Sequence, residues 1–226
     1  MAEDSLRKCM TFGADRAVLL TDRFFAGSDT LATSYALASA IRKIGNTWGK
    51  PDMVFAGKQT IDGDTAQVGP GIASRLGLRQ LTYVSAVNAI DQEKGSIEVE
   101  RRAEGGIQVL TTQLPVLITM IEGVNEMRRG TMQAALDAAR AKITVWSAQD
   151  AEVEDIQKCG LRGSPTVVKK VFAPTPRAEK AAQLPVAGKS AEEIAHLVLN
   201  DLFTRSPAIE ADLLRFAAHQ WQGGLT

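Results

Sequence analysis

The chain has 226 residues, of which 45% are hydrophobic and 23% are charged, a composition typical of one α/β domain with an extension. The 26 basic and 26 acidic side chains cancel, which argues against a general nucleic-acid binder and against attraction to an anionic membrane. The two cysteines are distant, and the chain shows no metal-ligand spacing, no membrane-spanning apolar run and no signal-peptide pattern. We therefore expect a cytoplasmic prokaryotic protein without a metal or a membrane insertion.

The first part of the chain alternates short apolar runs with helical patterns. In chain order the predicted elements are the end of a helix at 5–12, a strand at 16–21, a helix at 30–44 ended by Gly45, a strand at 52–57, a helix at 65–76 ended by Gly77, and a strand at 81–87. Apolar runs without polar alternation are typical of strands covered on both faces. This order predicts an α/β fold with right-handed crossovers and a mostly parallel, doubly wound sheet.

The second part begins with a different pattern. The predicted elements are an antiparallel hairpin at 96–102 and 107–112, a strand at 114–120, a helix at 130–141, a strand at 143–146, and helices at 190–203 and 208–221. Ser190 and Glu193 have the spacing of a capping box. Four prolines between residues 159 and 188 indicate an extended arm. We expect a nucleotide-binding domain at 1–158 and a C-terminal arm with helices at 159–226.

The loop after the strand at 52–57 is the first candidate site. It lies at the carboxyl end of a strand and the start of a helix, where α/β sheets bind ligands. Asp64 is expected to cap this helix with Gln67 reaching back, which leaves the amides of Thr65, Ala66 and Gln67 free to hold a phosphate. Asp-x-x-Gln before a helix is also a common capping device that needs no ligand.

A second candidate lies at residues 25–33, where another strand leads through a glycine-containing loop into a helix. Asp29 or Ser28 is expected to cap this helix, and the small residues after it leave room for a ligand near Thr30 and Thr33. A cap without any ligand explains the same pattern. Two helix starts that face one crevice would suit a large cofactor or several phosphates.

The sequence resembles the beta subunit of electron-transferring flavoproteins over residues 5–175. The matching segments are Ala56–Pro70, Gly13–Ala17, Leu114-Pro115, Asn125-Glu126-x-Arg128 and Gly160–Thr166. The residues of Thr65–Pro70 and Gly27–Thr33, together with Arg102, are more similar to the flavin-bifurcating, nitrogen-fixation-like branch. The family normally opens with a further strand and loop that we do not find before residue 5, so we expect the pocket to lack part of its wall.

This resemblance implies a doubly wound domain related to adenine-nucleotide hydrolases and a non-enzymatic electron-carrier subunit. It implies AMP or a second FAD in the first loop, and an alpha subunit that carries the redox flavin. Electrons would pass from acyl-CoA dehydrogenase-type partners or NADH to acceptors such as a quinone reductase. The implied cofactor contacts are Gly57, Lys58, Gln59, Thr60, Ile61, Asp62, Gly63, Asp64, Thr65, Ala66, Gln67 and Val68, with Asp29, Thr30 and Thr33 from the second loop.

The resemblance also implies a loop that docks on dehydrogenases, with Asn125, Glu126, Arg128 and an apolar anchor at Met132. Met127 occupies the position of a proline in the family motif. Helical spacing offers a second interpretation of Met132, as a buried core residue of the helix at 130–141.

Two other functions remain open at this point. A stand-alone nucleotide sensor of the universal-stress type would share the fold and would usually carry a Gly-x-x-Gly run late in the chain. A nucleotide-cleaving enzyme would need a general base and metal-binding carboxylates, and Asp62 and Asp64 are more simply explained by capping and ribose contact.

Overall fold

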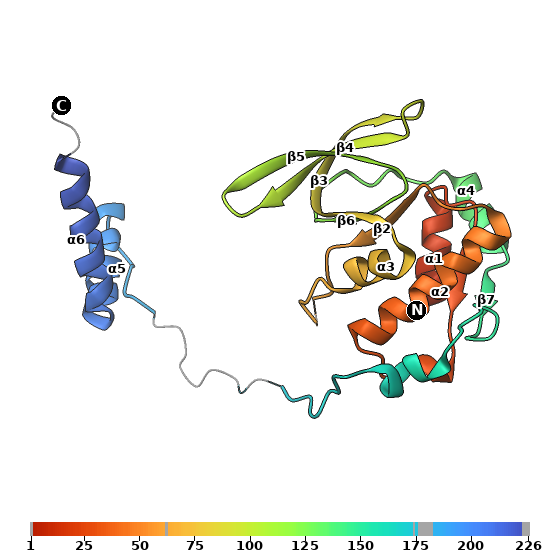
Figure 1. Ribbon diagram of the computed structural model, residues 1–226. Helices are drawn as coiled ribbons and strands as arrows, with labels where there is room; N and C mark the ends of the chain where they lie inside the picture. The colour runs from red at the N-terminus through yellow and green to blue at the C-terminus, as the bar shows by residue number, and fades with distance from the viewer. Residues whose placement is uncertain (1, 62, 174, 176–182, 223–226) are drawn as a thin grey trace. The chain divides into compact units, whose positions relative to one another are not determined.

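The computed structural model describes residues 2–61, 63–173, 175 and 183–222, without the side chains of residues 217–222 (Figure 1). The chain divides into two compact units, Met1–Lys170 and Val171–Thr226. The first unit combines sheets with helices and the second is a pair of helices, so the predicted α/β class is confirmed.

The first unit contains two sheets (Figure 1). The larger has five strands in the order β2-β6-β3-β4-β5, with bounds β2 Met53–Gly57, β6 Val116–Met120, β3 Arg79–Asp91, β4 Ser96–Ala103 and β5 Gly106–Gln113. β2, β6 and β3 are parallel, and β4 and β5 continue the sheet as the predicted antiparallel hairpin, so the sheet is mixed. β1 (Val18–Leu20) pairs in parallel with β7 (Thr144–Trp146) in a separate sheet.

Successive residues of a strand point to opposite faces of the sheet, so apolar residues of one strand can pack on both sides. On β6, Leu117 packs with Ile72 and Ala73 of α3 (Val68–Leu76), whereas its neighbours Val116 and Ile118 belong to a cluster on the other face. α2 (Thr30–Trp48) serves both sheets: Leu37 and Ile41 pack against the α3 cluster, and Ala40 and Ile44 pack against β1 and β7. α1 (Ala2–Thr11) lies against α4 (Met132–Arg140), where Arg7 Nη1 donates to the carbonyl of Ala138 at 2.9 Å.

α2 is one turn longer than the sequence predicts. The expectation that Gly45 ends it is wrong, because the helix continues to Trp48 and ends at Gly49, whose φ of 111° is in the left-handed region. The Trp48 ring stacks on Trp146 of β7, with ring centres 5.7 Å apart, and the Arg16 guanidinium lies 5.2 Å from the Trp48 ring centre. This stack supplies a tertiary contact that outweighs the low helix propensity of glycine.

α2 and α3 approach closely through small side chains. A Cβ atom built on Gly71 of α3 would lie 2.7 Å from Ser34 Oγ and 2.8 Å from Ser34 Cβ on α2. Ser34 is almost fully buried, as are Ala32, Ala36 and Ala38 on the same helix. The absence of a side chain at Gly71 therefore sets the distance between the two helices, and both helices begin at the same end of the unit (Figure 1).

The start of α2 is held by residues far along the chain. Ser164 Oγ accepts from the amide of Asp29 at 2.8 Å and donates to the carbonyl of Gly160 at 2.7 Å. The amide of Gly160 donates in turn to Ser28 Oγ at 3.1 Å, and Thr166 donates to Asp29 Oδ2 through its amide and hydroxyl at 3.2 and 2.9 Å. We call residues 159–166 the clamp. The prediction of an extended arm does not hold for the clamp, which packs in the first unit.

The second unit contains α5 (Ala191–Arg205) and α6 (Pro207–Gln222). The predicted capping box is confirmed, because Ser190 Oγ accepts from the amide of Glu193 and the Glu193 carboxylate accepts from the amide of Ser190. Large apolar side chains stay exposed on both helices, namely Val198, Leu199, Leu202, Ile209, Leu213, Leu214 and Phe216. Two helices alone therefore leave much of their apolar surface uncovered.

The contact between α2 and α3 gives the first prediction. Gly71→Ala should lower the free energy of unfolding by about 1–3 kcal/mol, because the new methyl group overlaps Ser34. Gly45→Ala is the matched control. It lies inside α2 with only ordinary contacts of 3.6 Å or more around a new Cβ, so it should raise stability by about 0.5–1 kcal/mol. Chemical denaturation of both variants measures this, and equal effects of the two would contradict the close-packing account.

The clamp gives a prediction about acid. Partial burial raises the pKa of the Asp29 carboxyl, but hydrogen bonds from Ala32, Thr166 and Leu31 outweigh it and hold this pKa below the ordinary value of 3.8. The stabilisation from Asp29 is therefore complete above its unfolded pKa of about 4 and is lost as the pH falls through the lower folded value.

Asp29→Asn should lower the free energy of unfolding at pH 7 by about 1 kcal/mol, because an amide oxygen replaces a charged acceptor. Its deficit relative to the wild type should shrink as the pH falls below about 4. Denaturant titrations at neutral and acid pH measure both effects, with the exposed Asp15→Asn as the control. A deficit that is independent of pH would show that the charge of Asp29 has no role.

Candidate functional site

The candidate site lies at the carboxyl edge of the parallel strands. β2 ends at Gly57 and β6 at Met120, and the amide of Lys58 donates to the carbonyl of Met120 at 2.9 Å. α3 begins after the loop that follows β2, and Thr30 Oγ1 at the start of α2 donates to Gln67 Oε1 at 2.7 Å. The structure therefore brings the two predicted helix starts together at the edge of the sheet where open α/β folds bind ligands.

A cavity of about 310 Å³ opens between these elements. It is lined by Thr30, Thr33, Ala56, Gly57, Lys58, Gln59, Thr60, Gly63, Thr65, Ala66, Gln67, Val68 and Gly69. Most of the cofactor residues predicted from the sequence are in this set. Ile61 is fully exposed outside it, and Asp62 lies outside the described residues. The size is within the range of small-molecule sites.

The predicted capping of α3 by Asp64 is wrong. α3 begins at Val68, three residues later than expected, and its N-cap is Gln67, which makes no side-chain capping bond. Asp64 instead lies in a turn in which its amide donates to the Thr60 carbonyl at 3.0 Å and its carboxylate accepts from the Gln59 side chain. The backbone of Asp64 has a φ of 47°, which a helix N-cap does not adopt.

The amides in front of α3 suit an anion for a different reason. Ala66 has a φ of 55° and Gln67 has φ −88° and ψ −23°, and such a change of hand turns successive N–H groups toward one point. The amides of Val68 and Gly69 follow in the first turn of α3, where they have no partner inside the helix. We call residues 66–69 the amide cradle. Its one left-handed residue, Ala66, is not a glycine, so the change of hand could not be predicted from the sequence.

The charge of the cavity agrees with this geometry. Lys58 is the only ionisable residue among the described residues that line it, and both α2 and α3 direct their positive dipole ends toward the cavity. The described residues of the lining include no histidine, carboxylate or cysteine. The charge of the described lining is therefore suited to hold an anionic group.

Asp29 lies next to this cavity. Its Oδ1 accepts from the amides of Leu31 and Ala32, at 2.9 and 3.0 Å, and its Oδ2 accepts from Thr166. A neighbouring cavity of about 370 Å³ includes Asp29 and Thr166 and shares Thr30 and Gln67 with the first. The sequence analysis used the segment 160–166 only as a family match and did not place Thr166 beside the site.

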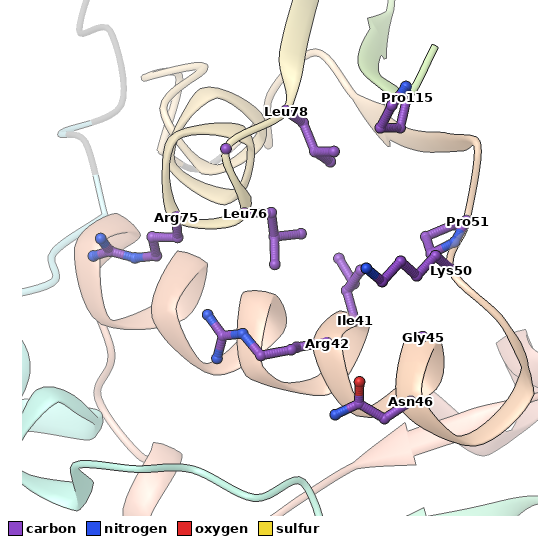
Figure 2. Close-up of a pocket in the computed structure, with 11 residues that line it drawn as sticks. Ile41, Arg42, Gly45, Asn46, Lys50, Pro51, Arg75, Leu76, Leu78 and Pro115 are labelled. Carbon is purple, nitrogen blue, oxygen red and sulfur yellow. The ribbon is translucent and has the colours of Figure 1, made fainter. Parts of the chain in front are cut away.

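A third cavity, of about 330 Å³, lies between the C-terminal ends of α2 and α3 (Figure 2). Figure 2 shows the apolar side chains of Ile41, Leu76 and Leu78 in it, near Pro51 and Pro115, which precede β2 and β6. This cavity is therefore at the amino edge of the strands. Its cations, Arg42, Lys50 and Arg75, complement the negative ends of two helix dipoles, and it contains no predicted site residue.

Arg128 connects the predicted docking loop to the residue that follows α1. Arg128 Nε donates to the carbonyl of Phe12 at 2.8 Å, and the Asn125 side chain has a long contact of 3.4 Å with the carbonyl of Glu126. Met132 is the first residue of α4 and its side chain is 78% exposed. The interpretation of Met132 as a buried core residue is therefore wrong.

Within the part of the chain that the structure describes, no cluster of three or more potential metal ligands occurs. The helices among the described residues are too short or too polar to cross a bilayer.

Comparison with known proteins identifies the family of the chain. The family model for the electron transfer flavoprotein domain matches residues 1–151. Protein FixA of Azorhizobium caulinodans is 65% identical over 216 residues, which are 96% of this chain and 76% of that protein. Protein FixA of Bradyrhizobium diazoefficiens is 64% identical over 216 residues, 96% of this chain and 74% of that protein.

A more distant relative carries the subunit name. The electron transfer flavoprotein subunit beta of Clostridium acetobutylicum is 41% identical over 201 residues, which are 89% of this chain and 73% of that protein. The identity is therefore higher to the nitrogen-fixation proteins than to this general beta subunit. The chain belongs to the electron transfer flavoprotein family, as a beta-type, electron-carrier subunit of the nitrogen-fixation branch.

Proposed function

We propose that this beta subunit binds an adenine nucleotide, AMP or FAD, with a phosphate group on the amide cradle. The observation that carries this proposal is the convergence of two helix starts, the cradle and Lys58 on one cavity. Each of these groups favours negative charge, and their combination is the recurring solution for phosphate in α/β proteins.

The residues of the chain divide the binding between them. The cradle amides and Lys58 hold the phosphate, Thr30 and Thr33 line the same space, and the Thr30–Gln67 hydrogen bond fixes the two helix starts. When bound, AMP supplies a structural tie, whereas FAD supplies a second redox centre. The similarity to the nitrogen-fixation branch favours FAD and with it a role in NADH-dependent electron bifurcation.

We also infer that the chain pairs with a flavin-carrying alpha subunit through its second unit. Seven large apolar side chains remain exposed on α5 and α6 among the described residues, more than a free helix pair would keep in water. Burial against a partner subunit explains them. We expect a doubly wound, hydrolase-like domain for the nucleotide and a cytoplasmic location for the complex.

Docking on electron donors or acceptors is assigned to the loop around Met132. An acyl-CoA dehydrogenase-type or quinone-reductase partner would receive this side chain in an apolar pocket, for which an exposed, adaptable methionine is suited. Exposed Leu136 lies one turn further along the same face of α4 and extends the apolar surface.

Cofactor content of the co-expressed complex tests the proposal. About two FAD per heterodimer would support the bifurcating branch, whereas one FAD and one AMP would support the housekeeping branch. A stable monomer that binds ATP without an alpha subunit would support the universal-stress alternative instead.

The charge of the cavity leads to a prediction for Lys58. Lys58→Ala should weaken the binding of AMP or FAD by the heterodimer about tenfold, because a charge-assisted contact to phosphate is lost. Titration of nucleotide-depleted complex, followed by calorimetry or flavin fluorescence, measures this. Lys94→Ala, which removes an exposed lysine paired with Asp91 in the β3–β4 hairpin, is the control and should leave the affinity unchanged. Equal affinities of the two variants would contradict a phosphate contact for Lys58.

The docking assignment predicts a separable defect. Met132→Ser should lower kcat/KM for electron transfer with the physiological redox partner about tenfold, because an apolar anchor is lost. The conservative change Met132→Leu should keep most of the rate. Steady-state assays at varied partner concentration measure this, with flavin content as the control. Loss of flavin from Met132→Ser would place Met132 in the fold instead of the docking surface.

A further inference from the structure

Tyr83 has a backbone conformation that aromatic residues avoid. Its φ is 59°, in the left-handed region, although it lies within strand β3. Such a conformation in a bulky residue is a true outlier and is kept only where the surroundings enforce it. Three of the four non-glycine residues with positive φ in the described chain, Asp64, Ala66 and Tyr83, lie at the carboxyl edge of the sheet; the fourth is Glu152.

The outlier is part of a bulge in β3. Leu81 pairs with Ile118 of β6 and Val84 pairs with Met120, so β3 contains one residue more than β6 over this stretch. The extra residue allows both Leu81 and Val84 to enter the same buried cluster despite their odd spacing. Packing explains the bulge, but it does not explain why a tyrosine occupies a position that glycine or asparagine would fill without strain.

Two contacts connect Tyr83 to the nucleotide cavity. Its amide donates to Oγ1 of buried Thr119 at 3.1 Å, and the methyl group of Thr119 faces the cradle, only 2.4 Å from the position of a Cβ on Gly69. Its ring centre lies 5.9 Å from Lys58 Nζ. Tyr83 is thus fixed to the wall of the cavity through its backbone, and its ring makes a cation–π contact with Lys58, the one cation among the described lining residues.

We propose that Tyr83 is a positioning residue that holds the Lys58 ammonium group toward the phosphate of the bound nucleotide, and this rests on the proposed function. A lysine side chain is flexible, and no carboxylate within the described residues forms an ion pair with Lys58. The π face of Tyr83 attracts the ammonium group without neutralising it. A carboxylate in the same place would hold the lysine equally well, but it would cancel the charge that the phosphate needs.

Nucleotide titration of the full heterodimer tests the proposal in a double-mutant cycle. Tyr83→Leu should weaken AMP or FAD binding about two- to fivefold, which corresponds to one exposed cation–π contact. Tyr83→Phe keeps the ring and should bind within about twofold of the wild type by the same reasoning. In the Lys58→Ala background Tyr83→Leu should have no further effect.

Tyr83→Gly separates strain from positioning. It removes the ring and relieves the backbone, so nucleotide affinity should fall as in Tyr83→Leu while the denaturation midpoint of the complex rises or stays the same. A structural role alone would make affinity and stability fall together.

Three outcomes would overturn the proposal. Wild-type affinity in Tyr83→Leu would show that the ring has no role, and an undiminished effect of Tyr83→Leu in the Lys58→Ala background would show that Tyr83 acts independently of Lys58. Failure of the wild-type complex to bind either nucleotide would overturn the proposed function as well.

Discussion

The contact between Gly71 and Ser34 determines where the functional end of this molecule lies. Because neither helix carries a larger side chain at this point, α2 and α3 lie close enough for Thr30 at the start of one to donate to Gln67 at the start of the other. Two positive dipole ends are then forced together, an arrangement that is electrostatically unfavourable without an anion between them. The packing of the helices thus concentrates positive potential at a point where a phosphate group would be stabilised.

The cost of this arrangement is concentrated at the same edge of the sheet. Left-handed backbone at Asp64, Ala66 and Tyr83, together with the bulge in β3, departs from regular structure where β2, β6 and β3 end. Strain at one site, held by a well-packed core elsewhere, is what a preorganised binding site requires. The opposite edge of the sheet shows regular pairing of Val116 with both Met53 and Arg79.

The sequence was sufficient for most of the elements and for the expectation that two loops meet at one edge of the sheet, since apolar runs, helical periodicity and turn glycines are local signals. It was misleading where a tertiary contact decided the outcome. Gly45 was predicted to end α2, but the stacking of Trp48 on Trp146 extends the helix beyond it. Asp64 was predicted to cap α3, but its left-handed backbone excludes that role. The clamp and Tyr83 gave no usable signal, because their partners lie far along the chain: 135 residues separate Asp29 from Ser164, and 36 separate Tyr83 from Thr119.

The clamp also sets when the start of α2 can be completed during synthesis. After Asp29 leaves the ribosome, 135 further residues must be made before Ser164 can accept its amide hydrogen bond. Until then the first turn of α2 lacks its hydrogen bonds to the clamp, and Thr30 is less firmly placed beside Gln67. The start of α2, and with it the position of Thr30 beside Gln67, is therefore fully held only after nearly all of the first unit has been translated.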